Sequence, residues 1–550
     1  MTRFGQALLL CLLLASGLAR AELATNMAVD VRAMSMGNAV TADPPGIMSV
    51  HFNPAGLTHL KGRRMDLQFL GVNFSVENTF TAPAGYNVFG YSDDPVVCAD
   101  LPNDGSSVCH QFKEGQSTVS GISLYLPIID KMINLPPGPL LAGPLPAFSI
   151  NPPGSKFTFA TATYLPMAAG LYHDKDDPGN FMGKQMALER ITYLSPSVGY
   201  KINDAWSVGA SIGFSYQAIA LDTDFRAPNM LMGFARTLYE NICAPFRGQS
   251  NLALDIFLFG VCRPNEGLGP FQNMASLNVS MTQRFSPSWN LGVLWEPVDW
   301  FAWGAVWQSE VKTHMNGNFK IEYAQATQDT INGIGGSPTG AIGLAVLGIP
   351  THINAEDVGQ ISMDLTMPAH FQTGIKIKPT DRLQFNVDLT WSDYKKWDAF
   401  NFQFDRSSAV LSLARLFSPQ STTSSLYFPL GFQSSWNLAF GAQYDLTNRL
   451  ALRAGYEPRA SAIPDDRRNP MVPINKAAYY SLGLGYKWDK DTDIDLAVAT
   501  IRSHDYIPHG TSCMANCEGL NNLVYNPYAG LNIETNTVIN MVGLAFRTSW

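Results

Sequence analysis

The chain has 550 residues, only 15% of them charged, and its formal net charge at pH 7 is −8. This acidic balance argues against a nucleic-acid binding protein. No apolar run of about 18 residues occurs after residue 21, which excludes membrane-spanning helices. A large all-β soluble protein and a membrane β-barrel both fit this composition.

Residues 1–21 have the features of a secretory signal peptide. Arg3 gives a positively charged start, Leu8–Leu14 form an apolar core, and the small residues of Ala19-Arg20-Ala21 suit a cleavage site. The sequence therefore predicts export and a mature chain that begins at Glu22.

The next segment, residues 22–62, neither alternates nor contains a long apolar run. It is rich in small residues, in Arg-Ala-Met-Ser-Met-Gly-Asn-Ala-Val-Thr-Ala-Asp at 32–43 and in Phe-Asn-Pro-Ala-Gly-Leu at 52–57. Asn53-Pro54 favours a turn, and Gly56 tolerates a left-handed backbone. We expect a compact, irregular segment ahead of the first strand.

From residue 63 onward the chain repeats a period-two pattern that predicts amphipathic strands. In Leu383–Trp391 the odd positions are apolar and the even positions polar, and Ser207–Leu221 alternates in the same way. Aromatic residues gather near strand ends, while Gly, Ser, Asn and Gln fill the other face, which favours a membrane barrel over a soluble sandwich. About fourteen strands are predicted, at 64–77, 119–129, 156–165, 190–202, 206–221, 285–297, 301–314, 360–378, 382–396, 435–446, 449–458, 477–488, 491–502 and 537–550.

The predicted connections alternate in length, as in an outer-membrane barrel. Tight turns such as Pro379–Asp381 and Thr447-Asn448 alternate with long loops. Lys131–Gly154, a Pro-rich stretch, stands where a short turn is expected. Trp550 ends an amphipathic strand with an aromatic residue, which resembles the signal read by the outer-membrane assembly machinery.

Six cysteines follow the signal peptide in sequence-local pairs. They are Cys98 and Cys109, Cys243 and Cys262, and Cys513 and Cys517, all in long connections. An even count in an exported chain predicts three disulfides. The alternative for the last pair is a metal site with His509, but no fourth ligand lies nearby, so no metal is predicted.

One stretch matches an enzyme motif. Gly209–Gly213 fits the hydrolase pattern G-x-S-x-G, which requires a strand-to-helix elbow. Ser211 instead lies in the middle of an alternating strand. We therefore predict neither an enzymatic activity nor a cofactor.

The two stretches at 32–43 and 52–57 together resemble the N-terminal hatch of the FadL-type outer-membrane transporters of long-chain fatty acids and other hydrophobic compounds. Further similar segments lie at Asn290–Lys312, Leu452–Asp465 and Tyr480–Tyr486. The resemblance implies an antiparallel transmembrane barrel of fourteen strands at 63–550, plugged by a hatch at 22–62, in the outer membrane of a Gram-negative bacterium. It also implies a monomer that takes up substrate passively and releases it sideways through a gap in the barrel wall.

The resemblance further implies binding residues. Asn53, Pro54, Ala55 and Gly56 would belong to the plug, and movement there would open the channel. Loop 222–284 would hold an outer capture groove, and the alternative is a small loop core pinned by Cys243–Cys262. The apolar residues expected in that groove are Met230, Leu231, Phe234, Leu238, Phe257 and Phe259. Arg226 has two interpretations: a partner for a substrate carboxylate, or a surface salt bridge to Asp222 or Asp224, which is favoured.

The resemblance leaves the substrate open. Long-chain fatty acids come first, and alkanes or monoaromatic hydrocarbons second, because the same architecture carries them. A general porin would need an open lumen, which residues 22–62 argue against. A surface barrel with an adhesive or structural role remains an alternative. The expected partners are the hydrophobic substrate, outer-membrane lipids and the assembly machinery, and not nucleic acid.

Overall fold

The computed structural model describes residues 29–84, 114–126, 129, 131–136, 138, 140–175, 177–181, 183–225, 273–473, 475–517 and 530–550. The predicted signal peptide and the expected start of the mature chain at Glu22 lie outside these residues.

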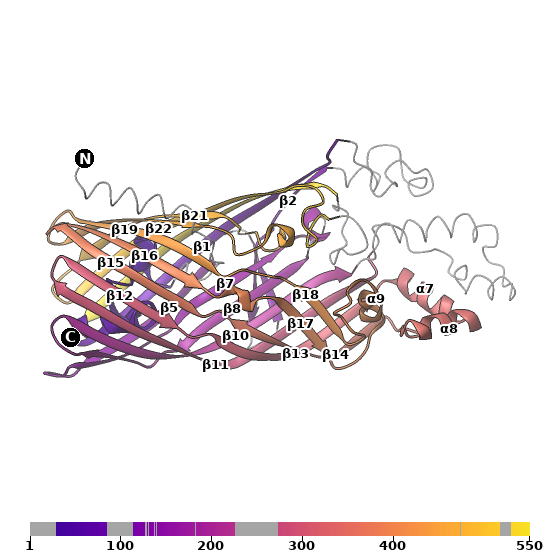
Figure 1. The fold of residues 1–550 in the computed structure, drawn as a ribbon, viewed down its shortest axis with the longest axis horizontal. Helices are drawn as coiled ribbons and strands as arrows, with labels where there is room; N and C mark the ends of the chain where they lie inside the picture. The colour runs from indigo at the N-terminus through magenta and orange to yellow at the C-terminus, as the bar shows by residue number, and fades with distance from the viewer. Residues whose placement is uncertain are drawn as a thin grey trace.

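One antiparallel sheet closes on itself as a barrel (Figure 1). The first strand, β1 (Gly62–Thr81), pairs with the last, β23 (Asn532–Ser549), from Arg64↔Ser549 to Thr81↔Asn532. The barrel has 14 strands, as predicted, because several of them consist of two segments separated by a bulge or break. In order around the wall they are β1; β2 (Glu114–Thr118) with β5 (Leu140–Asn151); β6 (Phe157–Ala162) with β7 (Tyr164–Tyr172); β8 (Gln185–Leu194) with β9 (Ser197–Lys201); β10 (Trp206–Phe225); β11 (Ala275–Val298); β12 (Phe301–Gln308) with β13 (Val311–Tyr323); β14 (Glu356–Met367) with β15 (His370–Thr380); β16 (Leu383–Ser392) with β17 (Ala399–Phe404); β18 (Ser425–Pro429) with β19 (Ser435–Asp445); β20 (Leu450–Arg459); β21 (Ala477–Lys487); β22 (Thr492–Ile507); and β23.

The predicted second strand at 119–129 is wrong. The chain leaves the wall after β2 and forms a separate hairpin from β3 (Ile122–Leu126) and β4 (Lys131–Leu135), then returns to pair with β1 as β5. The alternation at 119–129 is real, but its strand lies outside the barrel ladder. Lys131–Gly154 is therefore no turn: it supplies part of the hairpin and a wall strand with a cis Gly143–Pro144 peptide.

The two ends of the barrel differ. Short turns and the C-terminus lie at one end, here called the turn end, and the longer connections lie at the other, the loop end (Figure 1). The loop end carries the helices α7 (Gln325–Gly335), α8 (Pro338–Val346) and α9 (Ala409–Phe417). No helix in the described part of the chain is long and apolar enough to cross a membrane.

Two aromatic girdles bound a band of outward-facing apolar side chains. At the turn end, Trp206 stacks on Trp295 with ring centroids 5.7 Å apart. Midway along the barrel, Trp391 lies 6.2 Å from Trp307 and 6.4 Å from Trp436. Side chains between the girdles, such as those of Phe385, Leu482, Leu484, Leu496 and Val498, are exposed. This arrangement is the lipid-facing belt of a membrane barrel, as the sequence predicted.

Beyond the second girdle the chemistry of the wall inverts. On β13 the buried positions are apolar except Thr313, whose hydroxyl donates to the Leu365 carbonyl, whereas the side chains of Lys312 and His314 are 78% and 61% exposed. The inversion falls at the break between β12 and β13: Trp307 faces outward and Gln308 inward before it, and Val311 faces inward after it. In the turn-end half of the barrel the outer face is apolar and contacts lipid, and the inner face is polar. In the loop-end half the outer face is polar and contacts water, and the inner face is apolar.

Candidate functional site: the lumen and the segment inside it

The N-terminal segment from Val29 to Leu60 lies inside the barrel at the turn end, and nearly all of it is buried. It consists of α2 (Val31–Ser35), η1 (Gly46–Met48), α3 (Ser49–Phe52) and η2 (Pro54–His59). Its sequence explains these short helices. The Asp30 carboxylate accepts a hydrogen bond from the Ala33 N–H and caps α2, and Asn53 caps η2 with Pro54 in its first turn.

Asn53 and Pro54 rest on glycines of the wall. A side chain on Gly209 would overlap the Pro54 carbonyl, one on Gly292 would overlap the Asn53 amide, and a Cβ on Gly199 would lie 2.9 Å from Leu57 Cβ. Asn53 Nδ2 also donates to the carbonyls of Thr41 at 2.9 Å and Val293 at 3.0 Å. We call Gly199, Gly209, Gly292 and Gly304, which contact residues 41–58, the first glycine seat.

Helix α2 rests on a second glycine seat, formed by Gly441, Gly455, Gly483 and Gly543 on β19 to β23. A Cβ on Gly441 would lie 2.7 Å from the Met36 carbonyl oxygen, and one on Gly543 would lie 2.8 Å from Met34 Cε. Glycine on the inner face thus lets the segment's backbone approach the strands closely.

A buried charge cluster joins the segment to the wall. Arg547 donates to Asp30 at 2.8 Å and also pairs with Asp66 and Asp495. Arg453 reaches Asp495 at 2.5 Å. Both arginines face inward, with side chains only 9% and 10% exposed. Buried charges of this kind are tolerated only when they are paired.

A second charged contact centres on Asp43. Arg32 lies 2.5 Å from it, Lys376 lies 3.7 Å from it, and Gln384 donates to it at 2.8 Å. Burial alone would raise the pKa of this carboxyl, but Arg32 and Lys376 bring it well below its usual range. Asp43 is therefore charged at neutral pH.

Above the segment, toward the loop end, the inner face of the barrel carries a cluster of buried apolar side chains, here called the apolar chamber. Its wall is made of buried side chains from β11, β13, β14 and β17, and Val410 and Leu411 of α9 join them from the loop end. Wall residues include Leu277, Val279, Met281, Met315, Phe319, Ile321, Ile361, Met363, Leu365, Phe402 and Phe404.

Arg190 lies at the floor of this chamber. It pairs with Gln217 in the β8–β10 ladder, on the same face as Thr192 and Ser215, whose hydroxyls lie 2.9 Å apart. Its Nε donates to Ser215 Oγ at 3.3 Å, and no carboxylate of the described residues forms an ion pair with it. Gln217 is fully buried, and neither polar atom of its amide has a hydrogen-bond partner in the part of the chain that the structure describes. A cation without a counter-charge and an unsatisfied amide together favour an anionic ligand.

His51 of α3 faces the same floor. Its ring lies 4.9 Å from that of Tyr164. Burial lowers the pKa of His51 to about 3, and the positive charge of Arg190 acts in the same direction. His51 is thus neutral at physiological pH and adds no second cation.

The wall is incompletely paired beside the chamber floor. β5 pairs with β6 only from Ala147↔Ala162 to Ile150↔Phe159, and the next pairing toward the loop end is the Gly121↔Tyr172 bridge. Between these points, Leu140–Leu145 of β5 have no ladder to β7. Unpaired backbone is costly in lipid, so a break in a membrane barrel is expected where it borders a cavity or passage.

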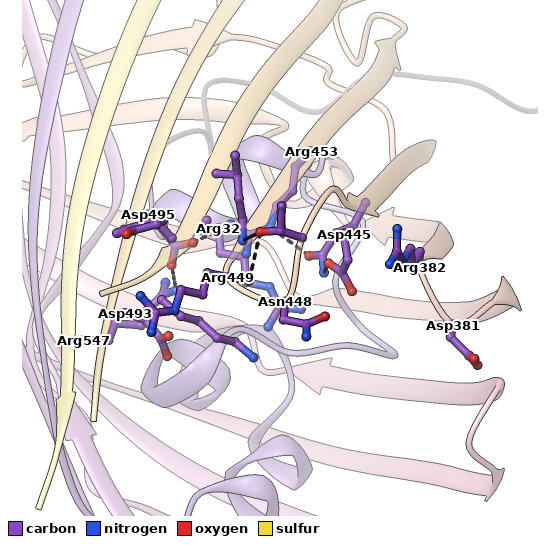
Figure 2. Close-up of a pocket in the computed structure, with 17 residues that line it drawn as sticks. Arg32, Asp381, Arg382, Asp445, Asn448, Arg449, Arg453, Asp493, Asp495 and Arg547 are labelled. Carbon is purple, nitrogen blue, oxygen red and sulfur yellow. Dashed lines mark hydrogen bonds and ion pairs between the residues drawn. The ribbon is translucent and has the colours of Figure 1, made fainter. Parts of the chain in front are cut away.

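A charged cavity of about 620 Å³ lies at the turn end (Figure 2). Arg32 of the N-terminal segment lines it, together with Arg382, Arg449, Arg453 and Asp495 of the wall and its turns. This lining is unsuited to an apolar ligand, and the cavity lies on the far side of the segment from the chamber.

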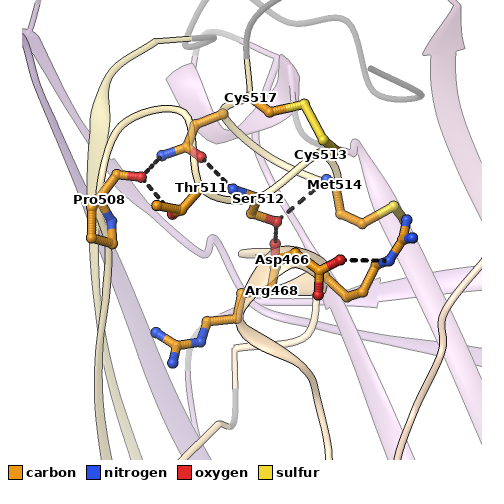
Figure 3. The surroundings of a disulfide bond; sticks show 10 residues. Asp466, Arg468, Pro508, Thr511, Ser512, Cys513, Met514 and Cys517 are labelled. Atoms are coloured by element: carbon orange, nitrogen blue, oxygen red, sulfur yellow. Dashed lines mark hydrogen bonds and ion pairs between the residues drawn. A yellow bond between two sulfur atoms is a disulfide. The ribbon is translucent and has the colours of Figure 1, made fainter. Parts of the chain in front are cut away.

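At the loop end, Cys513 and Cys517 form a disulfide, as predicted (Figure 3). The enclosed Asn516 donates through Nδ2 to the carbonyls of Pro508 at 2.9 Å and Leu531 at 2.7 Å. The disulfide thus closes a small, internally hydrogen-bonded loop.

Several predicted residues lie outside the described part of the chain. These are Arg226, the groove residues Met230, Leu231, Phe234, Leu238, Phe257 and Phe259, and the pairs Cys98–Cys109 and Cys243–Cys262. Of the predicted site, the structure describes Asn53, Pro54, Ala55 and Gly56, all buried. The sequence analysis missed Arg190 and the chamber. Two features of the sequence could have indicated them. Arg190 is a charged residue within a predicted strand, and in 312–322 the charged residues Lys312, His314, Lys320 and Glu322 recur at even positions among apolar residues.

A model of the family described as "Outer membrane protein transport protein (OMPP1/FadL/TodX)" matches residues 12–550. The chain belongs to this family. It is accordingly a protein of the outer membrane of Gram-negative bacteria, and the resemblance seen in the sequence is confirmed.

Relatives of this FadL/TodX chain are distant. A long-chain fatty acid transport protein of Escherichia coli O6:H1 is 21% identical over 349 residues, covering 63% of this chain and 64% of that protein. A 47 kDa outer membrane protein of Pasteurella multocida is 21% identical over 239 residues, covering 42% and 49%. The chain thus spans less than two thirds of the length of these relatives.

Solved structures share the fold. A Pseudomonas aeruginosa FadL homologue superposes with a TM-score of 0.61 at 17% identity, over 96% of this chain and 99% of that one. The Ralstonia pickettii toluene transporter TbuX gives a TM-score of 0.57 at 13% identity, over 96% and 99%. The family transports hydrophobic substrates across the outer membrane.

Proposed function

We propose that the protein takes up long-chain fatty acids passively, through the apolar chamber and sideways out of the break between β5 and β7. The single observation that carries this proposal is Arg190, a cation that pairs with no carboxylate of the described residues, at the floor of the apolar chamber. The chamber would hold the acyl chain, and Arg190 with Gln217 would hold the carboxylate.

The apolar chamber supports transport of a hydrophobic molecule. A porin requires a water-filled lumen, whereas here the inner face is apolar above the floor, and residues 29–60 fill the lumen below it. Each methylene of a ligand that leaves water for such a chamber gains about 0.8 kcal/mol. Binding energy of this origin needs no ATP.

The break in the wall supports sideways release. Met167, on the β7 edge beside the break, belongs to the apolar chamber cluster and pairs with Arg190 in the β7–β8 ladder. A ligand held at Arg190 would therefore lie one strand away from the break. Release there takes the acyl chain from the chamber into lipid without an aqueous step. The N-terminal segment, held by its two glycine seats, would act as the hatch that blocks the straight path to the periplasm.

Uptake of alkanes or monoaromatic hydrocarbons is the second candidate. The apolar chamber favours it, and two of the similar folds are named toluene transporters. Such ligands have no charge for Arg190 to neutralise, so the arginine separates the two candidates.

Binding to purified protein tests the proposal. We expect a long-chain fatty acid to bind, and Arg190→Gln to weaken that binding at least about tenfold, since the charged hydrogen bond that is lost contributes about 1.5–3 kcal/mol. Hexadecane and toluene should bind Arg190→Gln and the unmutated protein alike. Arg284→Gln, which removes an exposed arginine of β11, is the matched control. If hydrocarbons bind and the acid does not, the second candidate replaces the first; if neither binds, uptake through this chamber is wrong.

A further inference from the structure

The hairpin β3–β4 packs on the outside of the barrel. Tyr193 of β8 is 43% exposed and faces outward, whereas Arg190 and Thr192 face the lumen. Ala187 and Glu189 share the outward face with Tyr193. Tyr125 of β3 packs against Ala187, and its N–H donates to Glu189 Oε1 at 2.8 Å. The hairpin therefore covers the outer surface of the wall beside the break between β5 and β7.

The wall provides a flat seat of small side chains for this hairpin. Gly170, Ala187, Ala218 and Ala220 are neighbours across β7, β8 and β10, all on the outward face. A Cβ on Gly170 would overlap the Ser123 carbonyl of β3. Residues this small bury little apolar surface themselves. They instead allow the β3–β4 hairpin to approach the outer face of the wall closely.

The hairpin's turn lies at the level of the membrane surface. Tyr216 and Ile191 pair with each other and pack in the same cluster as Tyr125. Next to them, toward the turn end, the rings of Phe214 and Phe285 stack with centroids 5.2 Å apart. Phe285 is 56% exposed, as expected of the girdle. β3 descends from the loop end, since its start lies at Tyr172 and its end lies near Glu189. The end of β3 at Leu126 thus points toward the lipid band.

Leu126, the last residue of β3, and Ile129, the described residue between the two strands of the hairpin, have exposed apolar side chains. Leu126 is 36% exposed and Ile129 is 53% exposed, and Leu141, where the chain rejoins the wall, is 76% exposed. Lys131 follows the turn and is exposed, so its amine can reach lipid phosphates while its stem lies along apolar surface. Exposed apolar side chains next to a lipid-facing girdle favour contact with the same lipid.

We propose that the β3–β4 hairpin is a flap whose end at Leu126 and Ile129 inserts into the acyl chains of the outer leaflet, beside the break in the wall. Its occupant is lipid, because the exposed apolar side chains of Leu126 and Ile129 continue the membrane-facing band at Phe285. The flap places a lipid-contacting surface next to the break, where a sideways-leaving substrate would enter the membrane. The lipid contact itself does not depend on which substrate is carried.

A spin label at Ile129 tests this placement. Ile129→Cys protein is labelled with a nitroxide, reconstituted in phosphatidylcholine vesicles and compared, after subtraction of background labelling, with Val498→Cys in the lipid-facing band and His314→Cys in the water-facing half. The readout is the ratio of the relaxation of the label by oxygen to its relaxation by a water-soluble nickel chelate. We expect this ratio at Ile129 to be several-fold higher than at His314 and similar to that at Val498. A ratio equal to that at His314 overturns the proposal.

Leu126→Cys provides the same measurement if Ile129→Cys fails to assemble. Because the readout is the label's exposure to lipid, a failure of fatty-acid binding would leave this result unchanged, and a water-exposed turn would leave the fatty-acid proposal unchanged. The two proposals can therefore fail separately.

Discussion

The two halves of the barrel use the same alternating strands with opposite chemistry. In the turn-end half, apolar residues such as Leu496 face lipid, and the polar inner face carries the glycine seats and the Arg547 cluster. In the loop-end half, Lys312 and His314 face outward and the inner face is apolar. The difference shows that alternation alone identifies a strand, and that the medium on each side decides which face is which.

The inner faces differ because their contents differ. A polypeptide segment fills the turn-end half, and its backbone needs hydrogen-bond partners and close approach, which Ser, Asn, Gln and Gly supply. The loop-end half holds an apolar chamber, which only apolar side chains can line without a desolvation cost. One barrel thus combines a closed half and a binding half.

The largest effect should follow from removing a glycine seat. In Gly209→Val the new side chain would overlap the Pro54 carbonyl, so residues 53–56 could not dock, and we expect the turn-end half to open. Single-channel recording in planar bilayers should show a stable conductance that the unmutated protein lacks. Gly343→Val on α8, where nothing lies within 4 Å of the new Cβ, is the control. A silent Gly209→Val barrel that assembles normally would show that the seat does not hold the plug.

The charge cluster should matter next, through stability. Asp30→Asn removes one buried carboxylate from Arg547 and should cost about 1.5–3 kcal/mol, the contribution of a charged hydrogen bond. The midpoint of thermal unfolding of the detergent-solubilised protein should fall measurably. Asp364→Asn, at an exposed ion pair with His314, should leave it nearly unchanged. Equal shifts for the two variants would contradict a special role for the cluster.

The chamber can be tested by exchanging the chemistry of one face. Met315→Asp places a charge in the apolar chamber and should reduce binding of any hydrophobic ligand by about tenfold or more, because burying an unpaired carboxylate is costly. Asn316→Asp puts the same charge on the outward face of the same strand and should have little effect. Titration with a fluorescent fatty acid measures both variants, and similar losses in the two would place the ligand elsewhere.

Most of the barrel could be predicted from the sequence, and the exceptions have physical causes. Alternation gave thirteen of the fourteen strands approximately, but not the second strand, because β3 alternates as a wall strand would while packing outside the wall on Gly170 and Ala187. A periodic pattern records that one face of a strand is covered, and not what covers it.

The binding half was harder to predict than the plug. Asn53-Pro54-Ala55-Gly56 is a contiguous motif, so its resemblance to a known family is visible in one stretch of sequence. Arg190, Gln217 and the chamber residues come from strands far apart in the chain, and only the barrel brings them together. Arg190 is missed for a second reason: a charged inward residue normally forms an ion pair, and only the folded structure reveals that no described carboxylate pairs with Arg190.

The smallest expected effect is a dependence of the closed half on acid, through Asp43. Because its pKa in the folded protein lies below the ordinary value of 3.8, the ion pairs of Asp43 stabilise the fold fully above that value and progressively less as pH falls below it. As pH falls below about 4, the unfolding midpoint should therefore decline more steeply in the unmutated protein than in Asp43→Asn, which has no carboxylate to protonate. Gln384 would still contact the asparagine, so the variant isolates the charge from the hydrogen bond. Parallel declines would mean that other carboxylates of the closed half carry the acid response, and that Arg32 and Lys376 neutralise Asp43 without stabilising the docked segment.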